Sequence, residues 1–213
     1  MRRQALIVGT GGHCRVILSV LASCDAHDVV GIVDLGTPRS GEVIMGISEI
    51  RSSSWLEEFR GQTNVDVFLA IGNNELRRTW WEKFQGFGLP LPNLISPHAI
   101  VDSHAHLGES NVVCARAFIG PEAILGDNNL VNTGAVLEHE VRLGSHCHVA
   151  PLSLLAGRSR VDDNSFIGAG AIVINDISVA ANITVGAGGT VIRNIADPGG
   201  VYVGVPARKA NSA

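Results

Sequence analysis

Residues 125–148 read LGDNNL VNTGAV LEHEVR LGSHCH, and each group of six begins with Leu or Val. The spacing continues in both directions without a gap. The sixteen positions are Val101, Leu107, Val113, Ile119, Leu125, Val131, Leu137, Leu143, Val149, Leu155, Val161, Ile167, Val173, Val179, Val185 and Val191. A period of six is neither the 3.6 of a helix nor the alternation of a strand. It predicts a solenoid in which each side of a coil points one aliphatic residue inward and then turns a corner.

Three such sides make a coil of eighteen residues. The position after each aliphatic residue is usually small or acidic, and the fifth position of the hexad is mostly Ala, Ser, Asn or Gly, as expected at a tight corner. A little over five coils then form an all-β prism about 25 Å tall, at roughly 4.8 Å between stacked strands.

Composition excludes several classes of protein. The 213 residues are enough for two modest domains, and 46% hydrophobic but only 5% aromatic residues suit a core of small aliphatics. A net charge of −4 gives no basic surface, so we expect neither a nucleic-acid partner nor membrane insertion. The apolar start of the chain is broken by glycines and is interpreted as a strand rather than a signal peptide. Four cysteines without a CxxC pair indicate buried thiols in a reducing cytoplasm.

The first 95 residues have a different pattern. Residues 5–8 predict a strand, residues 9–13 a glycine loop, and the apolar spacing after it a helix. Further strands are expected at 29–33 and 65–71, followed by an amphipathic helix over 75–87 whose apolar residues are Leu76, Trp80 and Phe84. This alternation predicts a small Rossmann-like α/β domain with a parallel sheet at 1–95, before a β-helical domain at 96–213.

Several residues would gather at the carboxyl ends of these strands, where such sheets bind ligands. They are Gly11, Gly12, His13, Asp34 and Gly72. Glycines allow a phosphate to approach the backbone, and the following helix offers unpaired N–H groups. Cys14 replaces the third glycine of the GxGxxG pattern, so the loop is not a full dinucleotide fingerprint. A sheet of half the usual size also has room for a mononucleotide rather than NAD. The alternative is a structural turn that merely needs glycine for a positive φ.

The hexads resemble the hexapeptide-repeat family, whose members fold as left-handed parallel β-helices and are mostly acyltransferases. Gly-Gly-His at 11–13, Ile-Gly-Asn-Asn at 71–74 and Val-Gly-Val-Pro-Ala at 203–207 are similar to the bacterial nucleotide-linked amino-sugar N-acetyltransferases. That group includes enzymes for UDP-linked 4-amino-6-deoxy sugars, for GDP-perosamine, and relatives described as sialic acid O-acetyltransferases. The most specific segment is residues 132–140, NTGAVLEHE.

The resemblance implies a role for each matching residue. His139 would be the general base and Glu140 would raise its basicity. His148 would contact acetyl-CoA near the thioester, and the Gly157 N–H would bind the thioester carbonyl. Asn132, Ala169 and Ala187 would line the coenzyme A groove. A homotrimer with active sites between subunits is expected, because a coenzyme A arm along one prism needs a second wall.

The residues support part of this assignment on their own. An amine attacks a thioester only as the free base, so a neutral imidazole is a suitable proton acceptor, and a neighbouring carboxylate raises its basicity. Gly157 follows His139 by eighteen residues, which places the two at equivalent points of adjacent coils, roughly 4.8 Å apart. The alternative for any single histidine is a solvated surface residue.

Other functions stay open. Asp34 is followed by Leu, Gly and Thr rather than by a second acidic residue, which leaves the nucleotide undecided between UDP, which we favour, and GDP. Sialic acid O-acetylation and a non-catalytic nucleotide-binding prism are the alternative functions. A zinc carbonic anhydrase of this fold typically includes two histidines five residues apart, a spacing absent from the sequence, so we expect no metal.

Overall fold

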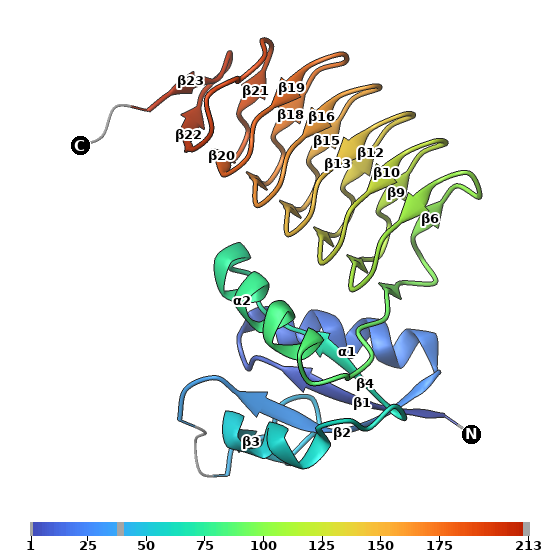
Figure 1. The fold of residues 1–213 in the computed structure, drawn as a ribbon. Coiled ribbons are helices and arrows are strands. Elements are labelled where there is room, and N and C mark those ends of the chain that lie inside the picture. The colour runs from blue at the N-terminus through green and yellow to red at the C-terminus, as the bar shows by residue number, and fades with distance from the viewer. Residues whose placement is uncertain (1, 38–40, 211–213) are drawn as a thin grey trace. The chain divides into compact units, whose positions relative to one another are not determined.

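The computed structural model describes residues 2–37 and 41–210 (Figure 1). The chain divides into two compact units, Met1–Ser96 and Pro97–Ala213. Each unit is described by itself.

The first unit is a four-stranded parallel sheet with helices. Its elements are β1 (Arg3–Val8), α1 (Gly12–Cys24), β2 (His27–Asp34), β3 (Ile50–Ser52), the 3-10 helix η1 (Ser53–Phe59), β4 (Val65–Leu69), α2 (Asn74–Gln85) and β5 (Leu94–Ile95). The strand order is β3-β2-β1-β4. The predicted α/β class is confirmed, whereas β3 and η1 were not predicted.

The residues that α2 buries differ in part from those predicted for its apolar face. Phe84 is fully buried, but Leu76 is 43% exposed and Arg77 is buried instead. The Arg77 guanidinium donates to the Ile71 carbonyl (3.2 Å) and to the Asn74 side chain (3.0 Å). A buried arginine is tolerated there because the segment that follows β4 supplies one backbone and one side-chain acceptor.

The second unit is a left-handed parallel β-helix, as predicted. Its three faces are named here after their first strands. The β6 sheet contains β6 (Ile100–Val101), β9 (Phe118–Ile119), β12 (Val136–Leu137), β15 (Leu154–Leu155), β18 (Ile172–Val173) and β21 (Thr190–Val191). The β7 sheet contains β7 (His106–Leu107), β10 (Ile124–Leu125), β13 (Arg142–Leu143), β16 (Arg160–Val161) and β19 (Ser178–Val179). The β8 sheet contains β8 (Val112–Val113), β11 (Leu130–Val131), β14 (His148–Val149), β17 (Phe166–Ile167), β20 (Ile183–Val185), β22 (Gly200–Val203) and the antiparallel β23 (Arg208–Lys209).

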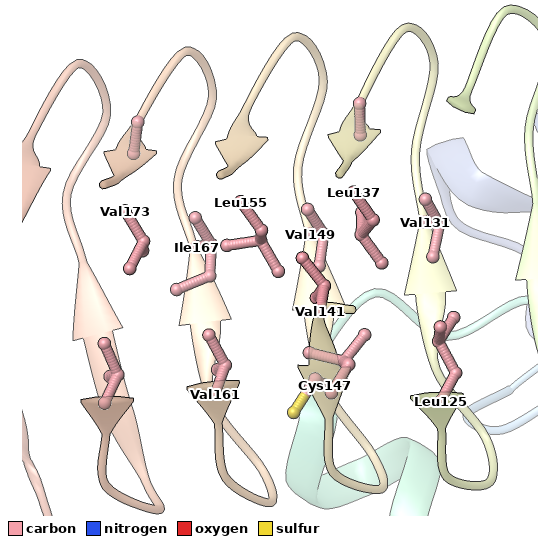
Figure 2. Packing of buried hydrophobic residues seen from close by; sticks show 14 of the residues in the cluster. Leu125, Val131, Leu137, Val141, Cys147, Val149, Leu155, Val161, Ile167 and Val173 are labelled. Atoms are coloured by element: carbon pink, nitrogen blue, oxygen red, sulfur yellow. The ribbon is translucent and has the colours of Figure 1, made fainter. Parts of the chain in front are cut away.

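The hexad residues form the core of this prism. The fourteen from Val113 to Val191 are at most 2% exposed, while Val101 and Leu107 in the first coil are partly buried. Figure 2 shows rows of them stacked from coil to coil, such as Val131, Val149 and Ile167. From β6 to β21, paired strands are eighteen residues apart, which confirms the predicted coil length. The last parallel pair, β20 with β22, has an offset of seventeen residues.

The corners have a regular backbone conformation. The fourth residue of every hexad from Ser110 to Gly188 has a φ between 54° and 66°. This left-handed region favours Gly and Asn, which occupy several of these positions. Glu140 is one of the exceptions, with φ 57°. The corner therefore fixes the direction in which the Glu140 side chain leaves the prism.

Among residues 2–37 and 41–210, no helix has the length and apolar character needed to cross a membrane. The four cysteines are free thiols, and three of them are buried. Burial raises the pKa of Cys14 and of Cys114 to about 11.

Candidate active site

His139 and Glu140 lie on the edge between the β6 and β7 sheets, called here the β6/β7 edge. The two residues follow β12 at the corner that leads into β13. Their side chains are 46% and 48% exposed, and the Nδ1 atom of His139 lies 3.1 Å from a carboxylate oxygen of Glu140. This contact selects the tautomer that carries its proton on Nδ1 and leaves Nε2 as the acceptor.

Gly157 lies next to the imidazole on the following coil. The backbone N–H of the next residue, Arg158, donates to the His139 carbonyl at 3.0 Å. A Cβ atom at position 157 would contact Nε2 of His139 and would lie 2.5 Å from its Cε1 atom. The ring therefore occupies the space that any side chain at 157 would need. The N–H of Gly157 itself has no acceptor among the described residues.

Two further charged residues continue the column of Glu140 along the same edge. Arg158 and Asp176 follow Glu140 at offsets of eighteen residues and share its left-handed conformation. Arg158 donates to both carboxylate oxygens of Asp176, at 2.7 and 3.1 Å, and lies 4.0 Å from Glu140. The hydrogen bond from Arg158, then one from Asn175, hold the pKa of Asp176 below its ordinary value. This pair was not predicted, although both residues lie at successive offsets of eighteen from Glu140 in the sequence.

The other prism residues expected at the site lie on a different edge, between the β8 and β6 sheets. Asn132, Ala169 and Ala187 occupy corners of this β8/β6 edge, with one further corner, after β14, between those of Asn132 and Ala169. His148 lies on the strand β14. The side chains of Asn132 and His148 are 3.3 Å apart, and His148 packs edge-on against Phe166 with ring centroids 5.0 Å apart. The strands of the β6 sheet separate this group from His139. One chain therefore does not bring all the expected residues together.

A groove of about 570 Å³ runs along the β6/β7 edge and the outer face of the β7 sheet. Side chains of four successive coils line it, and Glu140 is among them. Its charged and titratable residues include His104, His106, Glu122, Arg142, Arg158 and Arg160. The groove gives a ligand access to the side of the prism that carries the His139 and Glu140 pair.

In the first unit, the carboxyl ends of β1, β2 and β4 converge. The Gly9 N–H donates to the Val33 carbonyl at 2.8 Å, and the Ala70 N–H donates to the Val8 carbonyl at 2.8 Å. The carboxylate of Asp34 accepts the Thr10 hydroxyl (3.1 Å) and the Gly36 N–H (2.7 Å). Thr10 was not predicted, because nothing in the sequence shows that its hydroxyl fixes the rotamer of Asp34.

The glycines at this end differ in what the fold requires of them. Gly9 is needed by the fold, because its φ is 113° and a Cβ there would lie 2.7 Å from the Ala70 carbonyl oxygen. Gly11, Gly12 and Gly72 have no positive φ, and a Cβ at each would meet nothing within 4 Å. The positive-φ alternative therefore does not explain these three glycines.

The first turn of α1 is open. Gly11 occupies the N-cap position with no side-chain hydrogen bond, and the first turn carries no acidic residue. In α2, by contrast, the Asn73 side chain accepts the N–H of Leu76 at 2.9 Å. The N–H groups at the start of α1, together with its positive helix end, form a site suited to a phosphate. His13 lies in this turn.

This fold and these sites define a hexapeptide-repeat acyltransferase with an added α/β unit. Residues 4–84 match the PglD N-terminal domain family. The crystal structure of PerB from Caulobacter crescentus, in complex with CoA and GDP-perosamine, is similar over 98% of this chain and 97% of that chain, with 35% identity and a TM-score of 0.89. The chain belongs to the hexapeptide-repeat family of amino-sugar N-acetyltransferases.

Two other solved structures extend the comparison. The acetyltransferase domain of PglB from Neisseria gonorrhoeae FA1090 is 32% identical, with a TM-score of 0.90 over 98% of this chain and 100% of that chain. WeeI from Acinetobacter baumannii AYE, at 17% identity and a TM-score of 0.62 over 97% of this chain and 99% of that chain, shares the fold. A comparison with curated protein sequences gives no match.

Proposed function

We propose that the protein transfers an acetyl group from acetyl-CoA to the 4-amino group of a nucleotide-linked amino-deoxy sugar used to build a bacterial surface glycan. The likeness to PerB, a structure that contains CoA and GDP-perosamine, supports both substrates. A related PglB domain was solved with acetyl coenzyme A. The observation that carries the proposal within this chain is the His139 and Glu140 pair on an exposed prism edge above Gly157.

In the proposed mechanism, His139 accepts the proton of the attacking amine at Nε2. Glu140 holds Nδ1–H and stabilises the imidazolium that forms. The Gly157 N–H stabilises the oxyanion of the tetrahedral intermediate, a role that needs only a backbone donor. Collapse of that intermediate expels the thiolate of coenzyme A and leaves the amide.

We propose that transfer is direct, without an acetyl-enzyme. Cys147 is the thiol closest in sequence to His139, but it is fully buried and its Sγ donates to the Asp162 carbonyl at 3.2 Å. The protein should therefore show no added acetyl group by intact mass after incubation with acetyl-CoA alone. A stoichiometric acetyl adduct would contradict direct transfer.

The nucleotide sugar is proposed to bind to the first unit. Gly11, Gly12 and Gly72 are free of steric constraints from the fold, which supports a phosphate as the reason for them. Asp34, already oriented by Thr10, would accept hydrogen bonds from the ribose or the base. His13 would contact the sugar; an unchanged KM for nucleotide sugar in His13→Ala would contradict this.

A homotrimer is proposed as the active form. The outer face of the β6 sheet carries a registered apolar column of Ile100, Phe118, Val136, Leu154 and Ile172. This face lies between the edge with His139 and the edge with His148. Packing of a second copy against it would bring the two edges of neighbouring chains together and complete the coenzyme A site proposed for Asn132, His148, Ala169 and Ala187.

The substrate is tested by a screen of acetyl-CoA consumption. UDP-linked and GDP-linked 4-amino sugars and free sialic acid are supplied separately, and the products are identified by mass. We expect an N-acetylated nucleotide sugar. UDP is the nucleotide we favour from the sequence, and GDP-perosamine is the second candidate because of the PerB likeness. Turnover of sialic acid alone would contradict the proposal.

A further inference from the structure

The groove along the β7 sheet contains two arginines that the catalytic mechanism does not use. Arg142 on β13 and Arg160 on β16 are exposed and are paired in register. Their neighbours Leu143 and Val161 point into the core, so both arginine side chains leave the outer face of the same sheet. They are therefore adjacent, one strand spacing apart.

This arrangement is unfavourable in the protein alone. Like charges directly opposite each other on neighbouring strands repel and destabilise a sheet. Within residues 2–37 and 41–210, neither guanidinium forms an ion pair or a side-chain hydrogen bond. Arg158, which lines the same groove, differs because Asp176 binds it through two hydrogen bonds.

The other charged groups of the groove do not neutralise the two arginines through ion pairs. Two carboxylates also line it, Glu122 and Glu140, and Glu140 is engaged by His139. Neither carboxylate lies within ion-pair distance of the two arginines. Among the described residues, the groove thus holds two guanidinium groups that form no ion pair, beside the proposed catalytic edge.

We propose that Arg142 and Arg160 form a subsite for the diphosphate group of a substrate. A guanidinium binds a phosphate through two parallel hydrogen bonds, and two guanidiniums one strand apart can each bind one phosphate of a diphosphate. The groove has room for such a group, and its ligand would lie next to Glu140. The inference rests on the proposed function, since both the nucleotide sugar and acetyl-CoA contain a diphosphate.

The test measures ligand binding without turnover. Dissociation constants for CoA, UDP and GDP are obtained by calorimetry for wild type, Arg142→Gln, Arg160→Gln and the double variant. Arg208→Gln, an exposed arginine of β23, is the matched control. We expect each single variant to weaken one class of ligand by about 10- to 100-fold, as for a lost hydrogen bond between charged groups. Melting temperatures should be equal to or slightly above that of the control, because each variant removes the repulsion between the two guanidinium groups.

The ligand that is affected identifies the source of the diphosphate. Weaker binding of CoA alone assigns the subsite to the acetyl donor. Weaker binding of UDP or GDP alone assigns it to the nucleotide sugar and would contradict the phosphate site proposed at the start of α1. Affinities within twofold of the Arg208→Gln control for every ligand would overturn the subsite and leave the proposed function intact. A wild-type protein that binds none of the ligands would overturn both.

Discussion

At the scale of single residues, the site depends on how the His139 ring is held. Glu140 contacts Nδ1, and the other side of the ring packs over Gly157. The absence of a side chain at 157 is therefore as important to the imidazole as the carboxylate beside it. Any residue except proline would supply a backbone N–H at position 157. Glycine is needed there because the His139 ring occupies the space that a side chain would fill.

Gly157→Ala should reduce kcat by roughly 10- to 100-fold, because even a small displacement of a catalytic group is costly. The stability of the prism should change little, since the clash is with a side chain that can rotate away. The measurement is kcat together with the melting temperature. In a His139→Ala background the same substitution should have no further effect, because its target is gone. A further loss of rate in that background would contradict this explanation.

At the scale of structural elements, the β6/β7 edge carries a column of alternating charge from Glu140 to Asp176. Arg158 lies between Glu140 and Asp176, and each of these residues leaves a corner with the same left-handed backbone. The hydrogen bond that Arg158 donates to Asp176 raises the pKa of Arg158. The column therefore places two further charges, joined to each other by hydrogen bonds, along the edge that carries His139 and Glu140.

Arg158→Gln should raise the pKa of the Asp176 carboxyl toward its ordinary value. The hydrogen bond from Arg158 is the largest cause that lowers this pKa, and the one from Asn175 is the next. The measurement is the titration of the Asp176 carboxyl by NMR in wild type and in the variant. An unchanged pKa of Asp176 in Arg158→Gln would contradict a direct interaction between the two residues.

The N-terminal sheet contains an ion network of a different kind. Asp66 on β4 is 3% exposed and accepts two hydrogen bonds from Arg3 on β1, at 2.7 and 2.6 Å. Nε2 of His27 on β2 lies 2.8 Å from the same carboxylate. Burial alone would raise the pKa of Asp66, but Arg3 and His27 outweigh it and lower that pKa below its usual value. Three strands are thus joined at one carboxylate.

Asp66→Asn should lower the free energy of unfolding at pH 7 by about 1–3 kcal/mol. A carboxylate whose pKa is lowered in the folded state adds to the free energy of unfolding at pH values above its unfolded pKa. This contribution is lost as the pH falls through the folded pKa. The difference in the free energy of unfolding between wild type and Asp66→Asn should therefore shrink below about pH 4. Tryptophan fluorescence during urea unfolding reports this unit, because Trp55, Trp80 and Trp81 all lie in it. Asp28→Asn, at an exposed ion pair, is the control and should change little. A constant difference down to pH 2 would contradict the charge argument.

At the scale of the whole molecule, the expected site residues lie on two edges of the prism. His139, Glu140 and Gly157 occupy the β6/β7 edge, while Asn132 and His148 lie at the β8/β6 edge. A trimer packed through the β6 sheets would build each active site from two chains. In that case no single chain needs to bring all the residues of one active site together.

Mixed trimers of two inactive variants should regain activity. His139→Ala and His148→Ala affect different edges, so co-expressed chains would form some sites that contain both intact residues, about a quarter of all sites for random assembly. The measurement is the rate of the mixture against each variant alone. Leu154→Glu, which places a charge on the apolar face, should give monomers by ultracentrifugation and abolish this recovery. Mixtures as inactive as the separate variants would contradict a shared site.

Much of the architecture was predictable because it repeats. The hexad fixes which side chains point inward, and fourteen of the sixteen positions are fully enclosed by neighbouring coils. The short β3 and η1 have no such period, and their burial depends on Trp55 and Phe59 packing against distant strands. Likewise, the sequence indicated Asp34 but not Thr10, whose role depends on a contact made only in the folded chain.

The central claim is that His139 serves as the base for acetyl transfer to an amino sugar. The most direct measurement compares the kcat of wild type and His139→Ala on the nucleotide-linked 4-amino sugar that the screen identifies, with CoA binding measured in parallel. We predict a loss of about 10²- to 10⁴-fold in kcat, with CoA affinity within about twofold of wild type because the proposed base makes no binding contact that coenzyme A needs. A variant that retains the wild-type rate would contradict the assignment of His139.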